Sequence, residues 1–154
     1  MRILFVCLGN ICRSPTAEGV FRQRLAQAAL QQRVVVDSAG TAGWHVGKAP
    51  DSRTQQAARA RGYDLSALRG RQVEAADQQR FDLILAMDEH NLAELEAMRP
   101  AGATAELDLL LGRYGLTPRA VPDPYYGGDE GFVQVLELIE RAADALLDEV
   151  RGRL

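Results

Sequence analysis

The stretch RILFVCLGNICRSP, residues 2–15, joins an apolar run to a short turn and then to a helix start. The run RILFVC has no polar side chain after Arg2 and is soon followed by a glycine, which is typical of a strand buried on both faces. Ser14-Pro15 is typical of a helix N-terminus, with serine as the N-cap and proline in the first turn. The stretch therefore predicts a strand, a tight turn and a helix.

Strands and helices continue to alternate along the chain. We expect further strands at 34–40, 81–87 and 103–107, and further helices at 51–61, 89–98 and, with one apolar face, 132–150. This alternation predicts one domain over residues 1–154, an α/β three-layer sandwich with a central four-stranded parallel sheet and helices on both faces. Ligands of such folds bind at the carboxyl ends of the strands, where the turn at 7–14 lies.

The composition excludes several classes of protein. With 47% hydrophobic and 25% charged residues, the 154-residue chain matches an ordinary soluble domain. It has no apolar run of the ~20 residues that a membrane span needs, and no secretory signal. A net charge of −3 gives no basic footprint for nucleic acid. Two cysteines cannot form a disulfide framework, so we expect a cytoplasmic protein. We also expect a monomer with no nucleic-acid or membrane partner.

The turn after the first strand carries residues suited to binding an anion. Gly9 and Asn10 can both adopt a left-handed backbone, which lets the chain curl with its N–H groups pointing inward. Such a nest of amides at a helix N-terminus binds phosphate, and the planar fork of Arg13 can hold two of its oxygens. This positive surrounding favours a thiolate at Cys7, which would be a nucleophile beneath the bound phosphorus. A buried structural cysteine beside a solvated arginine is the simpler alternative.

Five motifs together resemble the low-molecular-weight protein tyrosine phosphatases. They are VCLGNICRSPTAEGVF (6–21), DSAGTAGWHVGKAPDSR (37–53), GRQV (70–73), ILAMDEHN (84–91) and DPYYGG (123–128). The resemblance covers nearly the whole chain, and the first and last motifs are the most specific. It implies a cysteine-dependent phosphatase that hydrolyses phosphotyrosine and small aryl phosphates without a cofactor or a metal. Its implied partners are tyrosine-phosphorylated proteins, with a tyrosine kinase as one candidate.

The resemblance assigns a role to each residue of the turn. Cys7 would form a phosphocysteine, and Arg13 with the amides of residues 8–13 would hold the phosphoryl oxygens. Ser14 would donate its hydroxyl to the Cys7 sulfur; this conflicts with a pure N-cap role, and we favour the contact with sulfur. Asn10 would support the loop, with Ser38 as a partner. The expected substrate-binding residues of the loop are Leu8, Gly9, Asn10, Ile11, Cys12 and Ser14.

Asp123 stands at the start of a loop rich in proline, glycine and tyrosine. One carboxyl group there can protonate a phenol leaving group and then deprotonate water, although Asp-Pro is also a common turn starter. With Leu8, the aromatic residues Trp44, Tyr125 and Tyr126 resemble the family's cleft walls, and such a slot would leave phosphoserine too short to reach the sulfur. We expect His45 to be a loop hydrogen-bonding residue.

The chain also departs from the family pattern. Leu68 replaces a common histidine that supports the loop asparagine, so Asn10 needs other partners. Ser52 stands where the family usually has a proline after Asp51. We expect Asp88 and Asn91 to brace the loops. Cys12 is either packing or a redox partner of Cys7 that captures an oxidised sulfur as a disulfide.

Three other functions fit less well. A thiol-relay arsenate reductase on the same fold needs further cysteines, and residues 82–98 contain none. A non-catalytic phosphoprotein-binding module would lack the nucleophile or the acid, both of which are present. A nucleotide-binding P-loop is excluded because GWHVGKA (43–49) has the wrong spacing.

Overall fold

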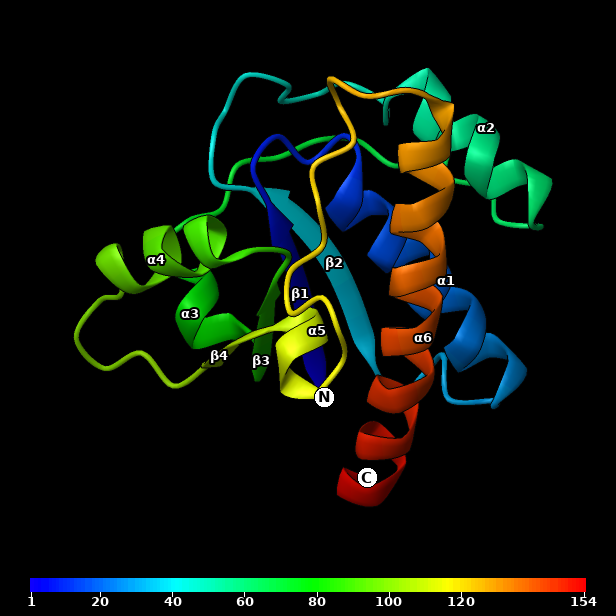
Figure 1. The fold of residues 1–154 in the computed structure, drawn as a ribbon. Coiled ribbons are helices and arrows are strands. Elements are labelled where there is room, and N and C mark those ends of the chain that lie inside the picture. The colour runs from blue at the N-terminus through cyan, green and yellow to red at the C-terminus, as the bar shows by residue number, and fades with distance from the viewer.

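The apolar run after Arg2 forms the strand on which the rest of the sheet is built. In the computed structural model, which describes residues 1–154, β1 (Arg2–Cys7) pairs in parallel with β2 (Val35–Gly40) and with β3 (Leu83–Ala86). The strand β4 (Glu106–Leu109) pairs in parallel with β3, so the sheet has the order β2-β1-β3-β4 (Figure 1).

Helices cover both faces of this sheet. They are α1 (Arg13–Gln27), α2 (Ser52–Ala60), α3 (Asp77–Arg80), α4 (Glu89–Ala97), α5 (Leu110–Arg113) and α6 (Asp129–Arg153). In Figure 1, α1 and α6 lie together on one side of the sheet, while α3 and α4 lie on the other. This is the predicted three-layer sandwich, formed as a single domain. No helix is both long and apolar enough to cross a lipid bilayer.

Alternate side chains of β1 enter two separate cores. Ile3 and Phe5 pack among the residues beneath α1 and α6, where the Phe5 ring meets that of Phe21 edge to face, with centroids 6.1 Å apart. Leu4 and Val6 point into the smaller core beneath α3 and α4. A strand with helices on both faces has no polar side, which explains its continuous apolar sequence.

The predicted helix ends and faces agree well with the structure. The Asp51 side chain caps α2 by accepting the N–H of Arg53, and Gly62 follows that helix with φ of +90°. The apolar face expected on the last helix is buried along its length, from Phe132 to Val150. Pro15 lies in the first turn of α1, as predicted.

Three predictions of local structure were wrong. The last strand covers Glu106–Leu109 rather than 103–107, because it lies at the sheet edge and alternates polar with apolar residues. The four-residue helices α3 and α5 were missed, since one turn shows no periodicity. The helix α1 begins at Arg13 with Cys12 as its N-cap residue, so Ser14 is inside the helix and is not its cap.

An ion-pair cluster fastens α6 to the edge of the sheet. Two nitrogens of Arg113 donate to the two carboxylate oxygens of Glu149 at 2.9 and 2.8 Å, and a third donates to Glu106 at 2.6 Å. The Tyr114 hydroxyl donates to Glu149 at 2.8 Å. Chiefly because of the Arg113 hydrogen bonds, the pKa of the Glu149 carboxyl falls from its ordinary value of 4.5 to about 2.

We predict that Glu149→Gln destabilises the fold by about 1–2 kcal/mol near pH 7, since the Arg113 contact keeps only a hydrogen bond. The folded pKa of Glu149 lies below its unfolded value, so the stabilisation is present above pH 4.5 and disappears as the pH falls toward about 2. Urea unfolding of both proteins across this range measures the effect. A difference that does not shrink in acid would contradict this assignment.

Candidate active site

The turn between β1 and α1 has a backbone with inward N–H groups. Asn10 adopts a left-handed conformation with φ of +57°, whereas Gly9, expected to be equally able to do so, does not. The N–H groups of Leu8, Gly9, Ile11 and Cys12 donate to no other atom of the protein. Buried or half-buried N–H groups without partners are rare, and four on one turn in front of a helix form a binding site for an anion.

The Cys7 sulfur lies at the bottom of this turn, with hydrogen-bond donors around it. Its Sγ atom accepts the N–H of Asn10 at 3.3 Å and contacts the Ser14 hydroxyl oxygen at 3.0 Å. Cys7 is only 2% exposed, so these two contacts are the polar surroundings of its sulfur within the protein. The position of Ser14 inside α1 aims its hydroxyl at the sulfur instead of at the helix backbone.

The side chain of Asn10 holds the turn in place. Its Nδ2 donates to the hydroxyls of Ser14 at 2.8 Å and Ser38 at 3.0 Å, and its Oδ1 accepts the N–H of Arg71 at 3.0 Å. The Ser38 contact is the predicted one. Leu68, which replaces the family's histidine, packs against the larger core and takes no part in these hydrogen bonds. The sequence did not indicate that the backbone of Arg71 would be the third partner of the Asn10 side chain.

Arg13 is buried beside the turn, and one edge of its guanidinium is free. Nη1 donates to Asp88 Oδ2 at 2.6 Å and to the carbonyl of Val121 at 3.0 Å. Nε and Nη2 donate no hydrogen bond within the protein, and Nη2 lies 3.7 Å from Asp123. Two N–H groups on one side of the planar fork are thus available to an oxyanion. Asp88 and Asn91 were expected to brace the loops; Asp88 holds the Arg13 guanidinium, and Asn91 shares with it the capping box of α4.

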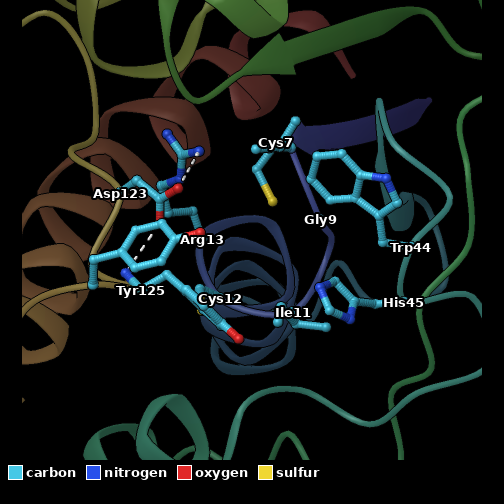
Figure 2. A pocket seen from close by; sticks show the side chains of 11 residues that line it. Cys7, Gly9, Ile11, Cys12, Arg13, Trp44, His45, Asp123 and Tyr125 are labelled. Carbon is cyan, nitrogen blue, oxygen red and sulfur yellow. Dashed lines mark hydrogen bonds and ion pairs between the residues drawn. The ribbon is translucent and has the colours of Figure 1, made fainter.

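Asp123 reaches the site from a loop that is distant in sequence. The Asp123 side chain is 41% exposed. Its Oδ1 accepts the N–H of Tyr125 at 3.1 Å, a hydrogen bond that closes the kind of turn that Asp-Pro favours. Its other oxygen is the one near Arg13. Figure 2 shows Asp123 and Arg13 together across the cavity from Trp44, with the Cys7 sulfur between the two sides.

A cavity of about 160 Å³ lies above the turn. Trp44 and His45 form one side of it and Tyr125 the other (Figure 2), and Tyr126 also lines it. The side chains of Trp44 and Tyr126 are 71% and 94% exposed, and the two tyrosine rings meet edge to face. An open mouth with aromatic walls and an anion site at its bottom suits an aromatic phosphate.

Ten of the twelve site residues expected from the sequence line this cavity. Asn10 and Ser14 do not, because they lie behind the turn and act through their neighbours. His45 was expected to form loop hydrogen bonds, yet its ring lines the cavity and lies near Gly9, where a Cβ atom would come within 3.0 Å of it. Its place next to Trp44 in the sequence was the signal for this role.

Cys12 differs from Cys7 in its surroundings. Both thiols are free, and both are buried. Burial raises the pKa of the Cys12 thiol to about 12, so this sulfur stays protonated at neutral pH. No group of three or more His, Cys, Asp or Glu side chains is placed to hold a metal ion.

Comparison with known proteins identifies relatives over the full length of the chain. A family model described as low molecular weight phosphotyrosine protein phosphatase matches residues 2–153. A low molecular weight protein-tyrosine-phosphatase of Streptomyces coelicolor is 44% identical over 99% of this chain and 95% of its own. A protein tyrosine phosphatase from Entamoeba histolytica superposes with a TM-score of 0.93 at 38% identity, covering 100% of this chain and 99% of its own. A Drosophila arginine phosphatase gives 0.91 at 35% identity, covering 97% and 98%.

Proposed function

Because this chain belongs to the low molecular weight phosphotyrosine protein phosphatase family, we propose that it hydrolyses phosphotyrosine through a phosphocysteine on Cys7. One observation carries the proposal. The Cys7 sulfur lies beneath a turn with four N–H groups that have no partner in the protein. A phosphate bound to these groups would hold its phosphorus above the nucleophile.

In the first step the Cys7 thiolate attacks phosphorus, and the bond to the tyrosine oxygen breaks. The loop amides and the free edge of Arg13 stabilise the charge on the three equatorial oxygens. Asp123 protonates the departing phenol oxygen, which makes it a better leaving group.

In the second step water attacks the phosphocysteine while Asp123 accepts its proton. The sulfur leaves as a thiolate, stabilised by the Ser14 hydroxyl 3.0 Å away. Inorganic phosphate is then released, and the free thiolate is restored. Every group in this cycle belongs to the chain itself, so the proposal includes no cofactor and no metal.

The aromatic walls support phosphotyrosine as the substrate. A phenyl ring fits between Trp44 and Tyr125, and its length lets the phosphate reach the bottom of the cavity. The arginine phosphatase among the relatives makes phosphoarginine a second substrate to test in the same assay. Tyrosine-phosphorylated proteins, among them a tyrosine kinase, are the partners we propose.

We propose that the active form is a monomer in which residues 1–154 make up one catalytic domain. The mechanism needs Cys7 in its reduced state, which supports a cytoplasmic location.

We predict that Cys7→Ser abolishes turnover of phosphotyrosine and of para-nitrophenyl phosphate, because a serine hydroxyl is not ionised in this site. Binding of inorganic phosphate should persist, since the amides and Arg13 remain. Steady-state kinetics and phosphate titration by calorimetry measure the two effects. Turnover near the wild-type rate in this variant would refute the role of Cys7 as nucleophile.

We predict that Asp123→Asn slows hydrolysis of phenyl phosphate by about 10²–10³-fold, in line with loss of a general acid. A nitrophenyl phosphate should lose much less, because its leaving group needs little protonation. The comparison of kcat for the two substrates isolates the proton transfer. Equal losses would remove Asp123 from this role.

We predict that mild peroxide inactivates the enzyme reversibly. Peroxide would oxidise the Cys7 thiolate to a sulfenic acid, and Cys12 would displace water from it to form a disulfide that dithiothreitol reduces. Because the pKa of Cys12 is raised to about 12, this capture should become faster as the pH rises. Bound phosphate should protect Cys7.

The control is Cys12→Ser, with each protein measured against its own starting rate. Thiols should rescue this variant poorly, because its oxidation continues to irreversible forms. Full rescue of Cys12→Ser, with no crosslinked peptide in the wild type, would show that Cys12 is only packing.

A further inference from the structure

A buried carboxylate in α1 lies behind the turn, outside the cavity. The Glu18 side chain is only 5% exposed, and its two oxygens have different partners. Oε1 accepts the hydroxyl of Ser38 at 2.6 Å, whereas Oε2 accepts Nε and Nη2 of Arg22 at 3.0 and 2.7 Å. The Arg22 side chain is 54% exposed, and its Nη2 also donates to the carbonyl of Val36 in β2 at 2.7 Å.

These contacts continue without a break to the Cys7 sulfur. The Ser38 hydroxyl that donates to Glu18 also accepts Nδ2 of Asn10 at 3.0 Å. The same Nδ2 group donates its second hydrogen to Ser14 at 2.8 Å, and the Ser14 oxygen lies 3.0 Å from Sγ. All the intermediate side chains are 5% exposed or less, so no bulk solvent competes for their hydrogen bonds.

The Glu18 carboxylate fixes the direction of its hydrogen bond with Ser38. A carboxylate only accepts, so Ser38 must give its proton to Glu18 and offer its lone pairs to Asn10. The orientation of the Asn10 amide is set independently, because its Oδ1 accepts the N–H of Arg71.

Ser14 then accepts from Asn10, which leaves its own proton for the Cys7 sulfur. The only competing acceptor is the Ala39 carbonyl at the longer distance of 3.4 Å. The chain of donors thus ends on the atom that carries negative charge in the reaction.

We propose that Arg22, on the surface of α1, is a positioning residue for the reaction. It holds the buried Glu18 carboxylate against Ser38, which keeps the Ser38 lone pairs facing Asn10; Asn10, fixed in this way, positions the Ser14 hydroxyl beside the Cys7 sulfur. A buried carboxylate without its cation is strongly disfavoured. Loss of Arg22 therefore frees the Ser38 hydroxyl to turn toward Asn10, which breaks the Asn10–Ser38 hydrogen bond and loosens the side chain that positions Ser14. The proposal rests on the proposed function, because it concerns the same thiolate.

The test compares Arg22→Met with Arg24→Met. Methionine keeps most of the apolar stem, and Arg24 lies on the same helix with ion pairs to Asp144 and Glu140 that lead away from the site. Three quantities are measured on the full chain: kcat for para-nitrophenyl phosphate, the inhibition constant of inorganic phosphate, and the pH midpoint of Cys7 alkylation by iodoacetate. Peptide mapping confirms that Cys7 is the residue alkylated.

For Arg22→Met we expect kcat to fall about fivefold and the alkylation midpoint to rise by about 0.5 pH unit, a small effect because Glu18, Ser38, Asn10 and Ser14 lie between Arg22 and the sulfur. The inhibition constant of phosphate should stay within about twofold, because the amides and Arg13 are untouched. Arg22→Lys should recover part of the loss. Arg24→Met should lower thermal stability without moving the alkylation midpoint.

A double-mutant cycle with Ser38→Ala tests the route. If Arg22 acts through Ser38, the double variant should lose little more kcat than Ser38→Ala alone. Additive losses, or an alkylation midpoint in Arg22→Met equal to that of the wild type, would overturn the proposal. If the wild type hydrolyses no aryl phosphate, the proposed function itself fails, and the alkylation midpoints still decide whether Arg22 acts on Cys7.

Discussion

The left-handed backbone at Asn10 is the constraint on which the site depends. A non-glycine residue with φ of +57° is strained, and the neighbouring N–H groups have no protein partner. Both features disfavour the turn when it is empty. The Asn10 side chain offsets this cost with three hydrogen bonds, to Ser14, Ser38 and the backbone of Arg71. The anion site is therefore preformed because one amide side chain fixes it.

The partners of Asn10 connect the turn to the rest of the molecule. Ser38 is in β2, next to β1, and Arg71 is anchored by its guanidinium on Asp77 of α3 at 3.0 and 3.1 Å. Asp77 is buried on the face of the sheet opposite to α1, so the turn is held from both layers of helices. Asn10, Ser38 and Asp77 are thus buried polar side chains that connect the turn to the sheet and to α3.

The two sides of the cleft are held in different ways. The floor depends on hydrogen bonds between buried groups, whereas the wall with Asp123 and Tyr125 is an exposed loop. Arg53, fixed by Asp51 at the start of α2, lies 5.4 Å from the ring centre of Tyr125 and 4.6 Å from that of Phe132. A rigid floor suits the binding of phosphate, and a loop held by contacts with aromatic rings can adjust to the substrate around it.

The sequence alone determined the local features of this protein. The strand, turn and helix of residues 2–15 follow from an apolar run, a flexible pair and a helix start, because each depends on neighbours within a few residues. The alternation of strands and helices predicted the parallel sheet, and the five motifs indicated the family and the residues of the cavity except His45. They also indicated Ser38 as the partner of Asn10.

Only the tertiary structure decided what depends on residues distant in sequence. It showed that Arg71 completes the support of Asn10 and that His45 forms a wall, and it confirmed the contact of Ser14 with sulfur in place of a helix cap. It also joined Glu18 and Arg22 to Ser38, which lies on another element. In the sequence these two are an ordinary i, i+4 ion pair on a helix. Their connection to Cys7 exists only because β2 lies against α1 and places a hydroxyl between the carboxylate and the turn.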